Sequence, residues 1–305
     1  MKALRFHAYG EPADVLRLED APAPTPAPGQ VRVRVHACGL NPADWALCRG
    51  LFATELPRGV GLDVSGTVEA VGEGVSDVGT GDLVLGPADY SRCPSAGAAE
   101  LAILTQWTRV PAGLDLVHAA ALPMAVETAC RSIDLLGVAA GQTLLVYGAG
   151  SMMGFAGVQM ALMRGARVIA AAGETYAAEL RGMGAEVTPY GDGLAERVRR
   201  ICGDAPDLIF DAGPVRGALA ELVRIAGGDG RRIVTISNHG PDAEALGVRN
   251  SFSALRWDKL AEFADLAAKG RFTVPIARTF PLADWREALE ISLSGHAHGK
   301  LVLLP

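Results

Sequence analysis

The order of apolar and polar residues changes character near residue 117. Before this point, residues 31–35 (Val-Arg-Val-Arg-Val) alternate apolar and polar side chains, and glycines interrupt the apolar stretches at 61–72 and 81–86. Alternation with a period of two is typical of half-buried β-strands, and glycines within them favour bends. The proline-rich residues 21–29 lack many amide donors, so we interpret them as a connector. The first third of the chain therefore predicts an all-β, barrel-like domain.

After residue 117, apolar strands alternate with segments of helical periodicity. We expect a helix over 118–136, an apolar strand at 143–147 and a helix that runs from a glycine turn to Met163. The remaining expected elements are strands at 166–171, 186–189, 207–210, 231–236 and 299–304, an extended segment at 275–280, and helices at 177–183, 194–202, 215–225, 259–269 and 283–292. This alternation predicts an α/β domain with a parallel, doubly wound sheet.

A glycine turn joins the first apolar strand of this domain to its helix. The segment 146–154 reads Val-Tyr-Gly-Ala-Gly-Ser-Met-Met-Gly. Gly148 permits a sharp turn, Gly150 permits close approach of a pyrophosphate, and Gly154 permits close packing of helix and strand. The spacing contains one residue more than the usual Gly-x-Gly-x-x-Gly, and the hydroxyl of Ser151 could bond a phosphate or crowd one. The context favours a dinucleotide site at a helix N-terminus; a turn that serves packing alone is the alternative.

The end of the second strand is where a ribose contact is expected. Glu174 lies about 20 residues beyond the turn, where an acid would accept hydrogen bonds from the ribose 2′-OH and repel a 2′-phosphate. An exposed acid at a helix N-terminus is an equally good interpretation. The candidates for holding a 2′-phosphate are Thr175, Tyr176 and Arg181.

Charge and composition exclude several classes of protein. The 28 basic and 34 acidic residues leave a net charge of −6, which argues against a nucleic-acid surface. The five cysteines have no C-x-x-C spacing, so we expect reduced thiols rather than a zinc knuckle or a disulfide framework. The polar N-terminus and the lack of an apolar run of about 18 residues predict a cytoplasmic protein with no signal peptide and no membrane span.

Taken together, several motifs spread along the chain resemble one protein family. They are residues 39–44 (Gly-Leu-Asn-Pro-Ala-Asp), 61–72, 119–123 (Ala-Ala-Ala-Leu-Pro), 148–154, 158–159, 164–170 and 294–303. Over nearly its whole length the chain resembles the zinc-independent, quinone oxidoreductase-like branch of the medium-chain dehydrogenase/reductase superfamily.

The resemblance implies a two-domain fold and a nicotinamide cofactor. The expected parts are a GroES-like β-barrel domain over 1–118, completed by 271–305, and a Rossmann dinucleotide-binding domain over 119–270. The cofactor implied is NADPH, bound in a cleft between the domains, and relatives of this kind often form homodimers. The partner implied is a small-molecule quinone or enone.

The positions that bind zinc in other branches of this superfamily lack suitable ligands here. Zinc-dependent relatives have a catalytic cysteine where this chain has Asn41, and a His-Glu pair where it has Leu62 and Asp63. Leu62 has no ligand atom, and the four-cysteine lobe of those relatives is absent, so no metal site is predicted. Without a Lewis acid, hydride addition to an already conjugated quinone or enone is the easier reaction.

The candidate cofactor residues combine the glycine turn with positions that the resemblance assigns. They are Asn41, Thr128, Gly148, Ala149, Gly150, Ser151, Met152, Met153, Gly154, Gly173, Glu174, Thr175, Tyr190, Asp211, Gly213 and Ser237. The resemblance places Asn41 and Thr128 at the nicotinamide end as positioning groups, with no acid or base assigned. Structural alternatives remain: a turn cap for Asn41, a hydroxyl bonded back to the helix for Thr128, a strand-end anchor for Tyr190 and a loop contact for Ser237.

Several positions depart from the family pattern. Relatives often carry a lysine near Ala177 and a serine near Glu174, so NADH is an alternative to NADPH. Phe52 and Ala46 stand where tyrosines are common, and Phe52 cannot donate a proton. The hypothesis is therefore an NAD(P)H-dependent reductase of quinones or α,β-unsaturated carbonyls, with the proton supplied by solvent or a relayed water. The alternatives are a dedicated biosynthetic enoyl or enone reductase and a catalytically weak NAD(P)H-binding sensor or interaction protein.

Overall fold

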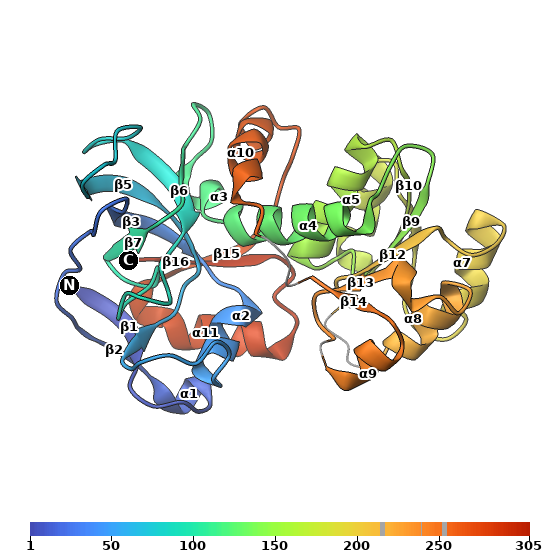
Figure 1. Cartoon of the computed structure of the whole chain (residues 1–305), viewed down its shortest axis with the longest axis horizontal. Helices are drawn as coiled ribbons and strands as arrows, with labels where there is room; N and C mark the ends of the chain where they lie inside the picture. The colour runs from blue at the N-terminus through green and yellow to red at the C-terminus, as the bar shows by residue number, and fades with distance from the viewer. Residues whose placement is uncertain (214–216, 239, 252–254) are drawn as a thin grey trace. The chain divides into compact units, whose positions relative to one another are not determined.

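The protein folds into two compact units. A computed structural model describes residues 1–213, 217–238, 240–251 and 255–305 (Figure 1). The first unit comprises Met1–Met124 and Trp257–Pro305, and the second comprises Ala125–Arg256. The sequence analysis placed the divisions after residues 118 and 270, so in the structure the first unit includes more of the chain on both sides.

The first unit is built on two β-sheets. One has seven strands in the order β15-β16-β3-β5-β6-β8, with β7 also paired to β3, and the other has three in the order β2-β1-β4. The strands are β1 (Lys2–Phe6), β2 (Leu16–Asp20), β3 (Val31–Gly39), β4 (Arg58–Gly59), β5 (Asp63–Val71), β6 (Leu83–Pro87), β7 (Leu101–Leu104), β8 (Thr108–Arg109), β15 (Ile276–Pro281) and β16 (Lys300–Leu304). All pairs are antiparallel except β15 with β16. The last strand thus completes the sheet that the first third of the chain begins.

The alternation seen in residues 31–35 sets the two faces of β3. Val31, Val33 and Val35 are buried in the core of this unit. Arg32 and Arg34, which point the other way, both contact Glu69 on the neighbouring strand β5. The period-two pattern therefore directs valines inward and a cross-strand charge cluster outward, as expected for a half-buried strand.

Helices cover this unit and join its two chain segments. They are α1 (Pro12–Val15), α2 (Pro42–Cys48), α3 (Leu116–Ala119), α10 (Leu260–Ala268) and α11 (Trp285–Ser294), with short 3₁₀ turns at Trp257–Lys259 and Leu282–Asp284. Trp45 of α2 is buried, and its Nε1 donates to Ser292 Oγ of α11 at 2.7 Å. This bond ties the C-terminal segment to the N-terminal one.

The single helix predicted over 118–136 is wrong. The structure has two helices, α3 and then α4 (Pro123–Leu136), which crosses from the first unit into the second. Proline lacks an N–H and clashes with the preceding turn, so it ends one helix and suits the first position of the next. Pro123 accounts for the break.

The second unit is an α/β domain with a six-stranded sheet, all of whose strand pairs are parallel. The strand order is β11-β10-β9-β12-β13-β14. The strands are β9 (Thr143–Tyr147), β10 (Arg167–Ala171), β11 (Glu186–Thr188), β12 (Leu208–Asp211), β13 (Ile233–Thr235) and β14 (Arg249–Asn250). The chain starts at β9, builds outward through β10 and β11, and then returns to the other side of β9. The expected parallel, doubly wound sheet is confirmed.

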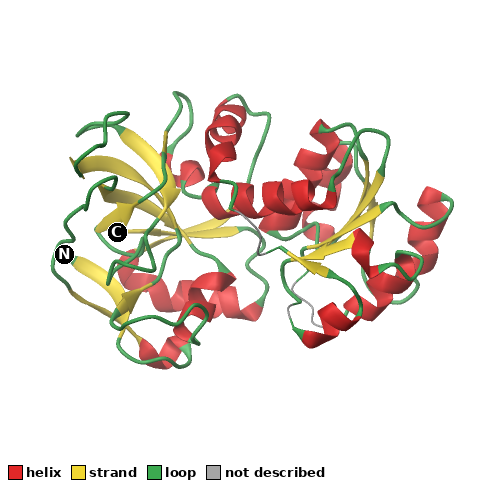
Figure 2. Ribbon diagram, in the orientation of Figure 1, coloured by secondary structure: helices red, strands yellow, loops and turns green. Residues whose placement is uncertain are grey.

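Helices lie on both faces of this sheet (Figure 2). The helices that follow α4 are α5 (Met152–Met163), α6 (Ala177–Gly182), α7 (Leu194–Cys202), α8 (Leu219–Ile225) and α9 (Pro241–Ala245), with 3₁₀ turns at Glu174–Tyr176 and Gly230–Arg232. Leu144 and Val146 of β9 pack with α4, α5 and α6, whereas Leu145 and Tyr147 pack with α7 and α8. A strand buried on both faces explains why residues 143–147 read as one apolar run. The predicted helix 215–225 is α8 from Leu219 onward; residues 215 and 216 lie outside the described part.

Across the described ranges, no helix combines the length and the apolar character needed to cross a lipid bilayer.

The contact between β3 and β5 generates a stability prediction. A Cβ on Gly66 would lie 2.1 Å from the backbone oxygen of Arg34. We expect Gly66→Ala to lower the free energy of unfolding by about 1–3 kcal/mol in urea titrations, because the ladder must shift to admit the methyl group. Gly79→Ala is the matched control, since no atom lies within 4 Å of its Cβ. Equal stability of the two variants would contradict the prediction.

Candidate active site

The glycine turn after β9 contains two glycines that the protein itself requires. Gly148 has a φ of +85°, and a Cβ there would lie 2.4 Å from backbone atoms of Ala212 and Gly213. A Cβ on Gly154, in the first turn of α5, would lie 2.2 Å from the oxygen of Gly148. Both positions are therefore explained by the backbone turn and by close packing of helix and turn.

Gly150 is different, because no protein atom accounts for it. No heavy atom lies within 4 Å of a Cβ built there, and its backbone is not in the left-handed region. The residue stands just before α5, a helix of 12 residues whose first N–H groups carry partial positive charge. A side chain at Gly150 would fill open space beside those N–H groups, so the turn fits a dinucleotide pyrophosphate.

The hydroxyl of Ser151 is used within the protein. Ser151 is the N-cap of α5, and its Oγ accepts from the N–H of Gly154 at 3.1 Å. The same hydroxyl donates to the carbonyl of Ala212 at 3.0 Å. It therefore caps the helix and ties the turn to the loop after β12, so its proton is not directed to a phosphate. Of the other turn residues, Ala149 is buried, and Met152 and Met153 are half-buried.

The residues expected near the adenosine follow β10 and β11. Gly173, Glu174 and Thr175 are exposed and directly follow β10, with Glu174 opening a 3₁₀ turn. Tyr190 follows β11, and its ring packs edge-on against Tyr147 at 5.2 Å between centroids. Burial raises the pKa of Tyr190 to about 12, against the opposing effect of a hydrogen bond with the backbone of Gly150. The structure thus brings Tyr190 to the glycine turn and leaves Glu174 in solvent.

Arg197 holds the loop that carries Tyr190. From α7, its guanidinium donates to Thr188 Oγ1 at 3.0 Å and to the carbonyls of Pro189 and Asp192 at 2.9 and 2.6 Å. Because one planar side chain binds several successive groups of the loop, the position of Tyr190 is set by the fold.

Asp211 connects the loops that follow β12 and β13. Its buried carboxylate accepts from Thr235 Oγ1 and from Asn238 Nδ2, both at 2.8 Å, and from the N–H of Gly213 at 3.2 Å. The N–H of Ser237 donates to Thr235 Oγ1 at 3.2 Å. Asp211, Gly213 and Ser237 therefore lie in one network. Asn238 was not predicted from the sequence, where its only signal was its place after an apolar strand.

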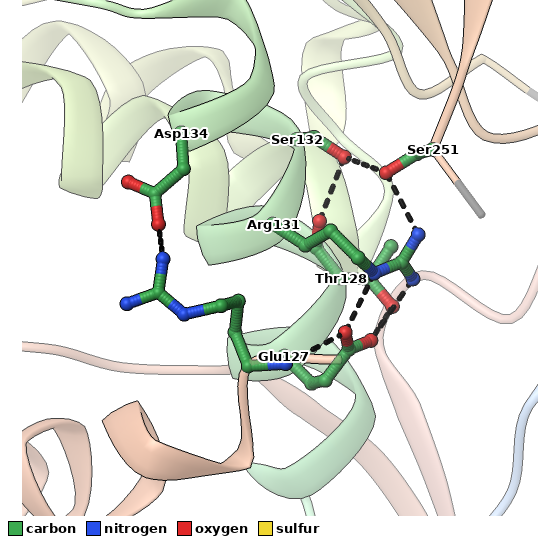
Figure 3. Close-up of polar contacts among 7 residues, drawn as sticks. Glu127, Thr128, Arg131, Ser132, Asp134 and Ser251 are labelled. Atoms are coloured by element: carbon green, nitrogen blue, oxygen red, sulfur yellow. Dashed lines mark hydrogen bonds and ion pairs between the residues drawn. The ribbon is translucent and has the colours of Figure 1, made fainter. Parts of the chain in front are cut away.

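Thr128 lies on α4 within a buried polar cluster (Figure 3). Its Oγ1 donates to Glu127 Oε2 at 3.2 Å rather than to the helix backbone. Arg131 binds the same carboxylate through two nitrogens. The sequence analysis missed Glu127 and Arg131, although a Glu-Arg pair four residues apart in an apolar helix was a visible signal.

Asn41 lies in the first unit, in a buried cluster with Asp63 and Lys300. The Lys300 ammonium donates to Asn41 Oδ1 at 2.6 Å and to Asp63 Oδ2 at 2.7 Å. Asn41 Nδ2 donates to Asp63 Oδ2 at 3.0 Å, and the N–H of Met124 donates to Asp63 Oδ1 at 2.9 Å. These bonds join the end of β3, the start of β5 and the start of β16.

Asp44 fixes the backbone around Asn41. Its carboxylate accepts from the N–H of Asn41 and from the N–H of Gly61, each at 2.7 Å. Burial raises the pKa of Asp44 to about 7, and these two backbone hydrogen bonds oppose the rise. Both hydrogen bonds of the Asp44 carboxylate come from backbone N–H groups, which indicates a structural role for this residue.

The residues at the zinc-ligand positions do not fit zinc. Leu62 has no lone pair to offer, and the side chains of Asn41 and Asp63 already bind the Lys300 ammonium. Among the described residues, no group of three His, Cys, Asp or Glu side chains is placed to hold a metal ion. We therefore assign no step to a metal, and the expectation of a zinc-free protein stays a prediction.

The buried ion pair generates a second stability prediction. The side chains of Lys300 and Asp63 are 2% and 0% exposed. We expect Lys300→Met to lower the free energy of unfolding by about 3–5 kcal/mol, because the buried Asp63 carboxyl loses its cation and must stay charged without a partner or take up a proton. Adding Asp63→Asn should restore at least half of that loss, since no charge is then buried. The control is Lys2→Met, which breaks an exposed pair with Asp20 and should leave the free energy of unfolding nearly unchanged. Urea unfolding measures all four proteins, and a double variant no more stable than Lys300→Met would contradict the explanation.

Comparisons with known proteins agree with this architecture. Residues 27–118 match the family model described as alcohol dehydrogenase GroES-like domain, and residues 183–303 match the one described as zinc-binding dehydrogenase. The first match confirms the GroES-like β-domain. The second match begins at residue 183 and so does not include residues 41 and 62.

Similar proteins include quinone oxidoreductases over the full length of the chain. The quinone oxidoreductase of Sus scrofa is 31% identical over 328 residues, spanning 100% of this chain and 98% of the relative. An NADPH-dependent alkenal/one oxidoreductase of Arabidopsis thaliana chloroplasts is 30% identical, spanning 100% of this chain and 80% of the relative. The solved structure of the quinone oxidoreductase from Coxiella burnetii superposes with a TM-score of 0.85 at 26% identity, covering 100% of this chain and 99% of that one. The chain is an oxidoreductase and belongs to the medium-chain dehydrogenase/reductase superfamily, in its quinone oxidoreductase-like branch.

Proposed function

We propose that the protein is a zinc-free reductase that uses NADPH or NADH to reduce a quinone or an α,β-unsaturated carbonyl compound. The observation that carries the proposal is the open space at Gly150, beside the first N–H groups of α5. A glycine that the protein does not need for its own packing is explained by the close approach of a phosphate. The two relatives described above supply the substrate class, since one is a quinone oxidoreductase and the other an alkenal/one oxidoreductase.

The groups that we assign to the cofactor come mainly from the second unit. In this proposal the turn at 148–154 holds the pyrophosphate, and the exposed residues after β10 together with Tyr190 bind the adenosine. Ser237 and Thr128 serve the nicotinamide end, and Asp211 fixes the loop that carries Ser237. When bound, the reduced cofactor supplies a hydride. The contribution of Asn41 from the first unit stays a prediction.

The side chains at residues 41 and 62, which do not suit zinc, limit the class of substrate that we propose. A simple ketone or aldehyde needs its carbonyl polarised, often by a metal. A quinone or enone is already electrophilic, and hydrogen-bond donors suffice to stabilise the charge that develops on its oxygen. A proton from solvent then completes the reduction.

Oxidation of NADPH and NADH should be measured with a broad panel of quinones and enones. We expect turnover with members of at least one class, and the proposal fails if neither cofactor is oxidised with any compound. Turnover confined to one enone would favour a dedicated biosynthetic reductase. Tight cofactor binding with no turnover would favour a sensor or interaction protein.

The position of Gly150 predicts that a substitution there weakens cofactor binding without changing the stability of the protein. Gly150→Ala should leave the melting temperature unchanged, because nothing lies within 4 Å of the new methyl group. It should weaken binding of both reduced cofactors about tenfold or more in fluorescence titrations, because the methyl group fills the space for the phosphate. Gly182→Ala, also in open space, is the control. Unchanged cofactor affinity in Gly150→Ala would remove the main support for the proposal.

Glu174 predicts the cofactor preference. Glu174 is exposed directly after β10, where its charge would repel a 2′-phosphate. We expect Glu174→Ser to improve NADPH affinity relative to NADH by about fivefold, the size of one screened charge repulsion of about 1 kcal/mol. Glu179→Ser removes another exposed acid from α6 and should leave the ratio unchanged. The same ratio in wild type and Glu174→Ser would show that Glu174 does not face the ribose.

A further inference from the structure

A buried ion pair on α4 is not used by any step proposed above. The side chain of Glu127 is 0% exposed, and that of Arg131, one helical turn later, is 8% exposed. Arg131 Nε and Nη2 donate to the two oxygens of Glu127 at 2.6 and 3.0 Å (Figure 3). The N–H of Arg256 also donates to Glu127 Oε1, at 3.3 Å. Burying two charges is costly, and apolar side chains of similar volume could fill the same space, so the pair indicates a role besides packing.

The pair determines what the Thr128 hydroxyl can do. Both oxygens of the Glu127 carboxylate accept hydrogen bonds from Arg131, so the carboxylate is an acceptor toward its other neighbours as well. Because Thr128 Oγ1 lies 3.2 Å from Glu127 Oε2, the hydroxyl must donate its single proton there. No other described residue forms a hydrogen bond with this oxygen, which keeps its two lone pairs for an incoming donor.

The backbone of Thr128 is held by the same cluster. Ser132 Oγ donates to the carbonyl of Thr128 at 2.7 Å, so its proton is committed. In the 2.8 Å contact between Ser132 and Ser251, the proton must therefore come from Ser251. Ser251 in turn accepts from Arg131 Nη1 at 2.9 Å. A single chain of donors thus runs from Arg131 through both serines to Thr128, and every proton in it has a fixed direction.

We propose that Glu127 is a positioning residue that turns the Thr128 hydroxyl into an obligatory acceptor, so that Thr128 selects the carboxamide N–H of a nicotinamide. The selection follows because a carboxamide offers both an N–H and a carbonyl, and only the N–H can pair with a lone pair. This inference rests on the proposed function, in which Thr128 serves the nicotinamide end of the cofactor.

An analogue without the N–H tests the inference by binding alone. Reduced 3-acetylpyridine adenine dinucleotide keeps the carbonyl but has a methyl group in place of the amide nitrogen. Wild type should bind NADH about tenfold more tightly than this analogue in competition fluorescence titrations, the value of one hydrogen bond to an otherwise unsatisfied group. Thr128→Val, which keeps the shape and removes the hydroxyl, should bring the ratio near one.

Variants of the ion pair test the role of Glu127 while the Thr128 side chain stays in place. In Glu127→Gln the amide N–H can donate to Thr128, which frees the hydroxyl proton, and the ratio should fall to about threefold or less. If this variant does not fold, Glu127→Met with Arg131→Met removes both charges together, a change that proteins often tolerate, and should lower the ratio equally. Glu179→Gln is the control: it removes an exposed acid of α6 that lies outside this cluster, and it should keep the wild-type ratio.

The outcomes distinguish failure of this inference from failure of the proposed function. Folded Glu127 variants that keep the tenfold ratio, while Thr128→Val loses it, would overturn the role of Glu127 and leave Thr128 as a cofactor contact. A wild-type ratio near one, a Thr128→Val variant with the wild-type ratio, or a loss of the ratio in Glu179→Gln would each overturn the inference without bearing on hydride transfer. A wild type that binds no reduced dinucleotide would overturn both.

Discussion

Parallel pairing of β9 with β10 and β12 is the constraint on which the candidate site depends. Parallel strands end at the same edge of a sheet, so the segments that follow them meet there. The glycine turn, the exposed residues after β10, and the loops after β11, β12 and β13 are all brought to this edge by the ladder alone. The contacts of Tyr190 with the turn and of Ser151 with Ala212 follow from that arrangement.

Within each unit, buried charges hold the segments that the ladder does not. Lys300 joins three strand and helix ends through Asn41 and Asp63, and Asp211 joins two loops. Glu127 and Arg131 connect α4 to Ser251. Removing each charge from water is unfavourable. Its hydrogen bonds offset the desolvation free energy because nearly all of its donor or acceptor positions are used. Such clusters specify one arrangement of loops more sharply than apolar contacts do.

The three clusters differ in what they leave for a ligand. In the Lys300 cluster, oxygens of Asn41 and Asp63 accept hydrogen bonds from an ammonium group. These are the positions at which the family resemblance places zinc ligands in other branches of the superfamily. In the Asp211 cluster, the carboxylate accepts hydrogen bonds that fix the loops after β12 and β13. In the Glu127 cluster the carboxylate accepts from Arg131, from the N–H of Arg256 and from the Thr128 hydroxyl, which leaves the lone pairs of Thr128 available. In the proposals above, one kind of buried polar network takes the place of a metal site in the first case and sets the polarity of a binding group in the last.

The sequence by itself determined the elements and the turn, because both depend on local patterns. Alternation predicted β3, apolar runs predicted the parallel strands, and three glycines marked the turn at 148–154. Local reasoning failed where it overlooked Pro123, which divides one expected helix into two. Only the tertiary structure decided which polar groups pair, as with Lys300 and Asp63, 237 residues apart, or Arg131 and Ser251, 120 apart. The physical reason is that hydrophobic periodicity acts over one or two turns of chain, whereas a buried charge takes whichever partner the closed fold brings within hydrogen-bonding distance.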